Sequence, residues 1–175
     1  MITVLQHRCA TLLHEAPFKE AQVFKRIVFP TDFSPPAQHA LKYAVSLALD
    51  HEAKIILVHV VEDIDFNAPF TLASTPVIQA YHEEMENQVK KELANFISTE
   101  MTPQIEVEKM VVTGKPFVEI VRIAQERMAD LIVISTHGKT GKIYTLLGST
   151  AARVVSRTSC PVLVIRHPDV EVVLQ

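Results

Sequence analysis

Short apolar runs alternate with longer amphipathic stretches along most of the chain. The runs are a few residues long and rich in Val, Ile and Leu, which is typical of strands covered by helices on both faces of a parallel sheet. Five runs are predicted as strands, at residues 26–30, 54–61, 104–112, 130–136 and 161–166. The third run alternates apolar and polar positions, so we expect it near an edge of the sheet.

The stretches between these runs carry apolar residues three and four positions apart, as one face of a helix does. Ser34 is a good N-cap residue and is followed by proline, so a helix is predicted to begin after it. Further helices are predicted to begin at Pro76 and Pro116, and a short one spans residues 148–157. The buried stripes expected in the first three helices are Ala37, Leu41, Ala44, Val45 and Ala48; Val77, Tyr81, Met85, Val89, Leu93 and Phe96; and Phe117, Ile120, Val121, Ala124 and Met128.

Alternating strands and helices indicate repeated strand–helix units. We therefore predict an α/β fold: an open doubly wound, Rossmann-like or flavodoxin-like sheet of five parallel strands in the order 3-2-1-4-5, with helices on both faces. Residues 1–24 show no sustained period and are predicted as an N-terminal extension; residues 25–166 form the domain, and 167–175 a C-terminal tail. Residues 62–75 are predicted as a long loop, of the kind that often serves as a lid.

The composition narrows the class of protein. Of 175 residues, 48% are hydrophobic and 21% charged, which excludes a disordered chain, and four glycines exclude a collagenous one. The net charge of −3 gives no reason to expect nucleic acid as a partner. The apolar runs are too short to span a membrane, and the N-terminal region has no apolar stretch typical of a secretory signal. Cys9 and Cys160 form neither a metal-binding spacing nor a disulfide framework, so we expect a cytoplasmic protein.

Three of the four glycines lie between positions 138 and 148, after the fourth predicted strand. In open α/β sheets ligands bind beyond the carboxyl ends of the strands, so this loop and the one after the first strand are the candidate sites. Gly138 allows a ligand to approach the backbone, and Gly148, Ser149 and Thr150 place amide donors and hydroxyls at a helix N-terminus, which favours an anion. The pattern indicates a phosphate cradle; alternatively, the glycines simply punctuate a loop.

The sequence also argues against two other kinds of phosphate-binding loop. Gly138, Lys139 and Thr140 resemble the end of a Walker A loop, but the position that requires the earlier glycine is Val133, within a strand. A flavin phosphate loop after the first strand is a poor fit to residues 31–36, because Asp32 would repel the phosphate and the two prolines lack amide donors.

The segment 25–166 resembles the universal stress protein family. The resemblance is carried by residues 30–34 (PTDFS) after the opening strand, by Thr113 and Gly114, and by residues 159–164 (SCPVLV) near the end. Nucleotide-binding members carry glycine, two residues, glycine, nine residues, then glycine with serine or threonine. Here Gly138 and Gly148–Ser149 match the second and third positions, whereas the first is Ser135.

The resemblance implies an ATP-binding stress-response or regulatory module with at most slow hydrolysis; the alternative is a member that binds no nucleotide and acts through protein contacts. It implies phosphate binding by the later glycines and hydroxyls, adenosine beside the loop after the first strand, and Val60 packing on the base, with His59 beside it. The nucleotide-binding residues are then Pro30, Thr31, Asp32, Val60, Ser135, Thr136, His137, Gly138, Gly148, Ser149 and Thr150. From the residues alone, a turn cap is the favoured interpretation of Asp32, and a structural role is the favoured interpretation of His59. His137 and Lys139 either neutralise phosphate or are solvated.

No dedicated catalytic group accompanies this pattern. There is no nucleophile elbow, zinc spacing or carboxylate pair, and Asp32 is the only carboxylate expected near the pocket, so a metal is expected only as Mg²⁺ or Mn²⁺ bridging the phosphates. Cys160 is interpreted as a small buried hydrophobe rather than a redox sensor. An apolar last strand is an exposed edge, and the resemblance implies a homodimer that pairs there through Val162 and Val164.

Overall fold

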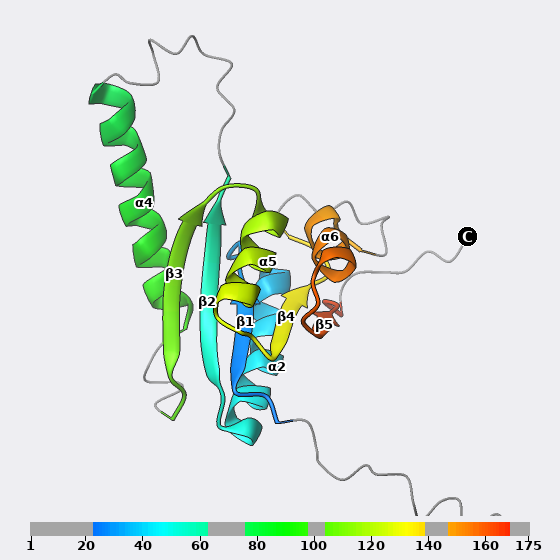
Figure 1. The fold of residues 1–175 in the computed structure, drawn as a ribbon. Helices are drawn as coiled ribbons and strands as arrows, with labels where there is room; N and C mark the ends of the chain where they lie inside the picture. The colour runs from blue at the N-terminus through cyan, green and yellow to red at the C-terminus, as the bar shows by residue number, and fades with distance from the viewer. Residues whose placement is uncertain (1–22, 63–75, 98–103, 139–146, 169–175) are drawn as a thin grey trace, which may run out of the picture.

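The computed structural model describes residues 23–62, 76–97, 104–138 and 147–168. Its elements follow one another as β1 (Arg26–Pro30), α2 (Pro35–His51), β2 (Lys54–Val61), α4 (Pro76–Phe96), β3 (Val107–Thr113), α5 (Pro116–Glu126), β4 (Leu131–Ser135), α6 (Ser149–Arg157) and β5 (Val162–Ile165) (Figure 1). The predicted extension before Val23, the loop over 63–75, Lys139 and the tail from residue 169 lie outside the described residues.

The five strands form one parallel sheet in the order β3-β2-β1-β4-β5. This confirms the predicted fold class and strand order. The third strand lies at an edge, as its alternating pattern predicted, although it begins at Val107 rather than at residue 104.

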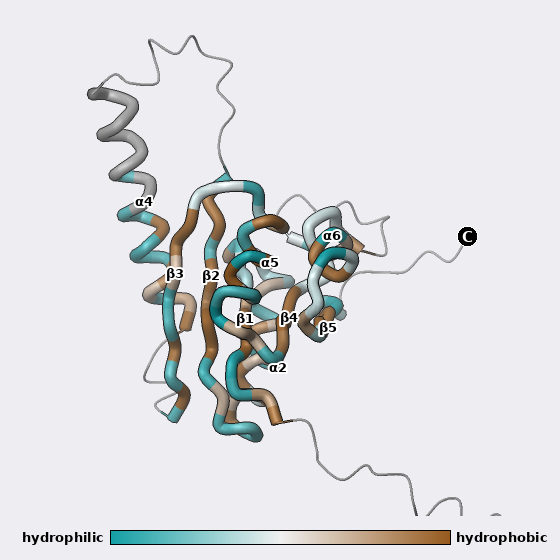
Figure 2. Tube along the Cα trace, in the orientation of Figure 1, coloured by the Kyte–Doolittle hydropathy of each residue, from teal (hydrophilic) through white to brown (hydrophobic). Residues whose placement is uncertain are grey.

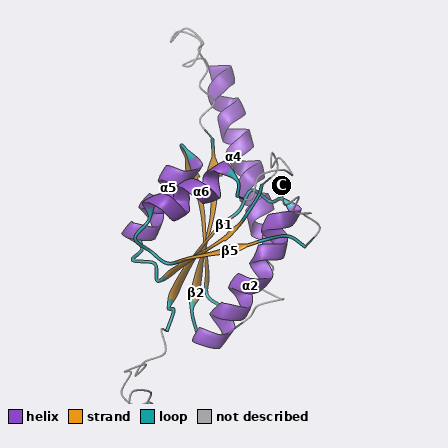
Figure 3. Ribbon diagram, turned by 90° about the vertical axis from the view of Figure 1, so that its right-hand side faces the viewer, coloured by secondary structure: helices purple, strands orange, loops and turns teal. Residues whose placement is uncertain are grey.

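Helices cover both faces of the sheet because alternate strand residues face opposite sides. One core contains Ile27, Phe29 and Leu57 with Leu93 of α4 and three alanines of α2, Ala40, Ala44 and Ala48. The other contains Val28 and Ile56 with residues of α5 and α6. Figure 3 shows α5 and α6 on one side of the sheet and α2 on the other. Figure 2 shows β2 as an almost continuous hydrophobic trace, as expected for a strand with two covered faces.

The helix starts are set by the capping residues that the sequence marks. Ser34 precedes α2, its side chain accepts a hydrogen bond from the backbone N–H of Ala37 (3.3 Å), and Pro35 occupies the first turn. Pro116 likewise begins α5. The predicted stripe of α2 is confirmed at its alanines, while Leu41 and Val45 are only partly buried and Ala40 is buried in addition.

The predicted stripe of α5 is wrong at its end. The helix stops at Glu126, and Met128 takes a left-handed φ of 50° with 66% of its surface exposed. Ile123, which the pattern did not include, is fully buried. The helix ends two residues before Met128, so this last predicted residue of the stripe lies beyond the helix and does not pack on the sheet.

The two central strands separate at their carboxyl ends. Pairing of β1 with β4 stops at Val28 and Ile132, whereas β1 stays paired with β2 as far as Pro30, and β4 with β5 as far as Ser135. The chain reverses its winding direction between β1 and β4, and ligands of doubly wound sheets bind at such a switch point. The fold therefore opens a crevice where the sequence placed the candidate loops.

Candidate functional site

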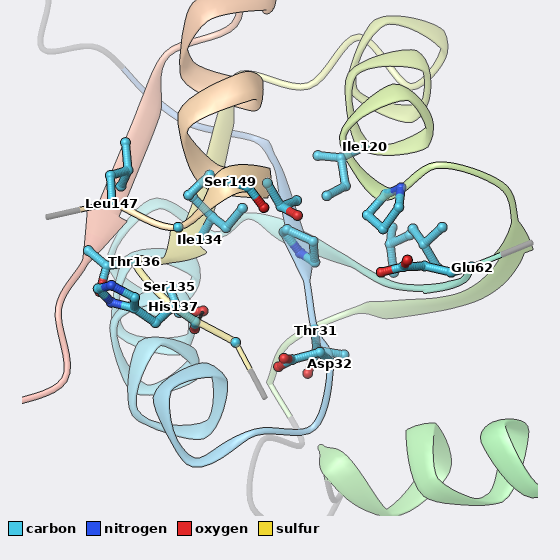
Figure 4. Close-up of a pocket in the computed structure, with 18 residues that line it drawn as sticks. Thr31, Asp32, Glu62, Ile120, Ile134, Ser135, Thr136, His137, Leu147 and Ser149 are labelled. Carbon is cyan, nitrogen blue, oxygen red and sulfur yellow. Dashed lines mark hydrogen bonds between the residues drawn. The ribbon is translucent and has the colours of Figure 1, made fainter. Parts of the chain in front are cut away.

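A pocket of about 530 Å³ lies in this crevice. That volume is within the range of small-molecule sites, roughly 300–1,000 Å³. It is lined by all eleven residues predicted to bind nucleotide: Pro30, Thr31, Asp32, Val60, Ser135, Thr136, His137, Gly138, Gly148, Ser149 and Thr150. The structure thus brings the two candidate loops together around one space, with Asp32, Ser149 and Glu62 at different sides of it (Figure 4).

The N-terminus of α6 forms one side of the pocket. Gly148 is its N-cap, and its N–H donates to the carbonyl of Thr136 (2.7 Å). A Cβ atom at Gly148 would come within 2.8 Å of that same carbonyl oxygen, so glycine is required for the helix to approach the β4 loop. The N–H groups of Ser149, Thr150 and Ala151 precede Ala152, whose N–H donates to the carbonyl of Gly148 (2.9 Å). These three groups have no acceptor within the helix and lie at the positive end of its dipole.

The loop after β4 is held by its own side chains. Ser135 donates its hydroxyl hydrogen to the carbonyl of His137 (2.9 Å), and the Nδ1 atom of His137 lies 3.0 Å from the hydroxyl of Thr136. All three residues are buried. His137 is only 6% exposed, so its interpretation as a solvated loop residue is wrong. Its imidazole lies beside Thr136, away from Asp32 and Ser149 (Figure 4).

Asp32 enters the pocket from the loop after β1. Its Oδ1 atom accepts a hydrogen bond from the N–H of Ser34 (3.1 Å), which is the turn-capping role expected from sequence. Its Oδ2 atom lies against Gly138, where any Cβ would collide with it. A side chain at position 138 would therefore push the Asp32 carboxylate out of its place beside the β4 loop. The carboxylate caps a turn and lines the pocket at the same time.

Alternation along β2 places the neighbouring residues His59 and Val60 on opposite faces of the sheet. Val58, Val60 and Glu62 line the pocket, whereas His59 stacks on Phe33 on the other face of the sheet. His59 therefore does not line the pocket, because adjacent strand residues point to opposite faces, and its contact with Phe33 fits the structural interpretation that is usual for a histidine at a strand end.

Glu62 corrects a second expectation. Its carboxylate also lines the pocket, so Asp32 is not the only one there. Glu62 directly follows β2, and the same rule about carboxyl ends of strands would have found it. The remaining lining residues that sequence reasoning missed are Val58, Pro116, Ile120, Ile134, Leu147 and Ala151. They are apolar, and their placement depends on how α5 and α6 pack on the sheet.

Cys160 lies at the opposite end of the sheet, in a shallow groove lined also by Met128 and Asp130. Its thiol donates to the carbonyl of Ala129 (3.2 Å) and is half-buried. Burial, and secondly the charge of Asp130, raise the pKa of the Cys160 thiol above its ordinary value. This environment favours the structural interpretation of Cys160.

The raised pKa predicts slow alkylation of Cys160. In a Cys9→Ser chain, where Cys160 is the only thiol, its reaction with iodoacetamide near pH 8 should be severalfold slower than that of the same chain in denaturant. Because the thiolate is the reactive form, the alkylation rate of the folded chain should rise only at a pH above the pKa of an ordinary cysteine thiol. Equal rates in the folded and unfolded chains would contradict the prediction.

Among the described residues, no group of three or more His, Cys, Asp or Glu side chains is placed to hold a metal ion. No helix in the part of the chain that the structure describes is long and apolar enough to cross a membrane.

The fold and the pocket define a class: a doubly wound α/β protein with a small-molecule crevice between the central strands. Residues 24–166 match the model of the universal stress protein family, so the chain belongs to that family. A universal stress protein of Methanocaldococcus jannaschii, MJ0531, is 35% identical over 150 residues, which cover 85% of this chain and 86% of the relative. A second one from that organism, MJ0577, is 31% identical and covers 84% of this chain and 98% of the relative.

Solved structures agree with the fold. The structure of MJ0577 superposes with a TM-score of 0.72 and 28% identity, covering 84% of this chain and 99% of that one. A universal stress protein in complex with cAMP superposes with a TM-score of 0.52 and 25% identity, covering 82% of this chain and 98% of that one. At least one structural relative thus binds an adenine nucleotide.

Proposed function

We propose that this universal stress protein binds ATP in the pocket at the switch point and acts as a stress-response or regulatory module with at most slow hydrolysis. The observation that carries the proposal is the cradle formed by Gly138, Gly148 and the N-terminus of α6. A Cβ at Gly148 would press on the backbone carbonyl of Thr136, and one at Gly138 would displace the Asp32 carboxylate, so both glycines favour this close approach of the two loops. The helix N-terminus then offers amides and hydroxyls to an anion.

The charges of the pocket give the nucleotide an orientation. Asp32 and Glu62 repel phosphate, whereas the N-terminus of α6 attracts it. The phosphates therefore belong at Gly138, Gly148, Ser149 and Thr150, beside the β4 loop of Ser135, Thr136 and His137. The adenosine belongs near Pro30, Thr31 and Asp32, with Val60 against the base. Among the described lining residues there is no Lys or Arg, so Mg²⁺ or Mn²⁺ bridging the phosphates would offset their charge.

Calorimetric titration of the purified chain with ATP tests the proposal. We expect saturable binding at micromolar ATP in the presence of magnesium, weakened severalfold when the metal is chelated, and much weaker binding of adenosine, which lacks phosphates. The cAMP complex of a relative supports an adenine ligand in this fold. Absence of saturable binding at millimolar ATP would reject the proposal and favour the interaction module that binds no nucleotide.

We also propose that the chain forms a homodimer through β5. This strand is at the edge of the sheet, and its residues Val162, Leu163 and Val164 are apolar yet only partly buried. An apolar edge strand presents unpaired backbone groups that a second copy can satisfy.

A further inference from the structure

The loop that carries Asp32 is supported from the face of the sheet opposite the pocket. Within residues 31–34, the N–H of Phe33 donates to the hydroxyl of Thr31 (3.0 Å), and that of Ser34 donates to Asp32 (3.1 Å). These bonds curl the loop tightly and set the direction of the Asp32 carboxylate, one oxygen of which faces Gly138. The position of this carboxylate therefore depends on the loop's conformation.

That conformation is unfavourable at Phe33. Its φ of 63° lies in the left-handed region, which a bulky aromatic residue rarely adopts. A residue held there needs surrounding contacts that outweigh the cost. Phe33 belongs to the core formed with α2 and α4, whereas Val58 and Val60 of the pocket belong to the other core. The contacts that hold Phe33 thus lie on the far side of the sheet from the ligand.

His59 supplies two of those contacts. Its Nδ1–H donates to the carbonyl of Thr31 (2.8 Å), at the start of the loop. Its ring stacks on that of Phe33, with centroids 4.5 Å apart and planes inclined by 20°. Phe96 adds an edge-on contact to Phe33 at 5.5 Å. One side chain thus contacts both the residue before Asp32 and the residue after it.

We infer that His59 is a positioning residue for Asp32: from outside the pocket, it holds the loop that presents the carboxylate to the ligand. The inference rests on the proposed function, in which Asp32 contacts the nucleotide. His59 touches no ligand in this arrangement. His59 also contacts Thr31, which lines the pocket as well. If the effect of His59 on affinity passes through Asp32 and not through Thr31, a change at His59 should have no consequence once the Asp32 carboxylate is gone.

A ligand-free measurement tests the positioning itself. The variant His59→Leu keeps apolar volume in the core but removes the donor and the aromatic ring. Amide hydrogen exchange of Ser34, whose N–H is bonded to Asp32, should become about fivefold faster or more in this variant. His59→Asn, whose side-chain amide replaces the Nδ1 donor, should restore part of the protection. Unchanged exchange at Ser34 in His59→Leu would overturn the inference.

Nucleotide affinity supplies the second measurement. With ATP and magnesium, His59→Leu should weaken binding about fivefold to tenfold. The double variant with Asp32→Ala should bind no more weakly than Asp32→Ala alone, because the two changes act through one group. If the losses multiply instead, His59 acts independently of Asp32 and the inference fails. If the unmodified chain binds no nucleotide, the proposed function fails, while the exchange of Ser34 still decides whether His59 positions Asp32.

His51 provides a matched control. It also contacts a phenylalanine on the α2 face, with its ring 5.0 Å from that of Phe24, but it lies at the end of α2 away from the pocket. His51→Leu should leave both Ser34 exchange and ATP affinity unchanged. If it changes them as much as His59→Leu does, the effect is one of general stability and the inference is overturned. Thermal unfolding of all variants identifies such a loss directly.

Discussion

Replacing Ser149 with glutamate is expected to abolish ATP binding, with a loss of at least about a hundredfold in affinity. A hundredfold corresponds to about 2.7 kcal/mol, a plausible cost for placing a carboxylate beside phosphates in a partly enclosed site. Ser149 is the first residue of α6, it is exposed, and it lines the pocket. A glutamate at a helix N-terminus is itself favourable, so the variant should fold and compete with the phosphate for the same amides.

The matched control is Ser149→Gln, which adds the same volume without the charge. It should weaken ATP only severalfold, and calorimetry of the two variants side by side isolates the electrostatic contribution. Ser149 is a cleaner position for this test than Gly148, where any Cβ would press on the backbone carbonyl of Thr136. Equal affinities for the glutamate and glutamine variants would place the phosphates elsewhere.

Replacing Val164 with lysine is expected to convert a dimer into a monomer. Sedimentation of the unmodified chain should give twice the monomer mass of 19.6 kDa, and that of Val164→Lys should give the monomer mass. Val164 lies in the edge strand β5 and is partly exposed, so two opposed lysines would face each other across a two-fold interface.

Val155→Lys is the control for the added charge. Val155 is 45% exposed and belongs to α6, not to the strand proposed to pair, so this variant should remain dimeric. Circular dichroism of both variants verifies that they are folded. A monomeric unmodified chain would show that the edge of β5 is not used for pairing.

The fold was predictable because its signals are local. The apolar runs of β1, β2 and β4 are buried on both faces, and a pattern without alternation indicates such strands. Ser34 and Pro116 marked helix starts through capping chemistry that depends only on neighbouring residues. Met128 shows the limit: helical spacing continues to it, but the helix ends at Glu126 and the chain turns through a left-handed residue.

The loops of the site were predictable for a related reason. Glycines and hydroxyls near a helix start indicate an anion cradle, and all eleven predicted residues line the pocket. Whether they bind nucleotide stays a prediction. The apolar wall was not predictable, since Ile120 and Leu147 reach the pocket only through the packing of α5 and the approach to α6. The burial of His137 depends in the same way on contacts that no short sequence window contains.

The separation of β1 from β4 affects how ligand choice can change within this fold. The crevice exists because backbone pairing stops after Val28 and Ile132, and Pro30 has no N–H to donate where the strands part. Most side chains around the crevice come from loops and helix ends, where substitutions leave the central ladder intact. A lineage can therefore exchange one ligand for another, or lose its ligand altogether, while retaining the same stable sheet.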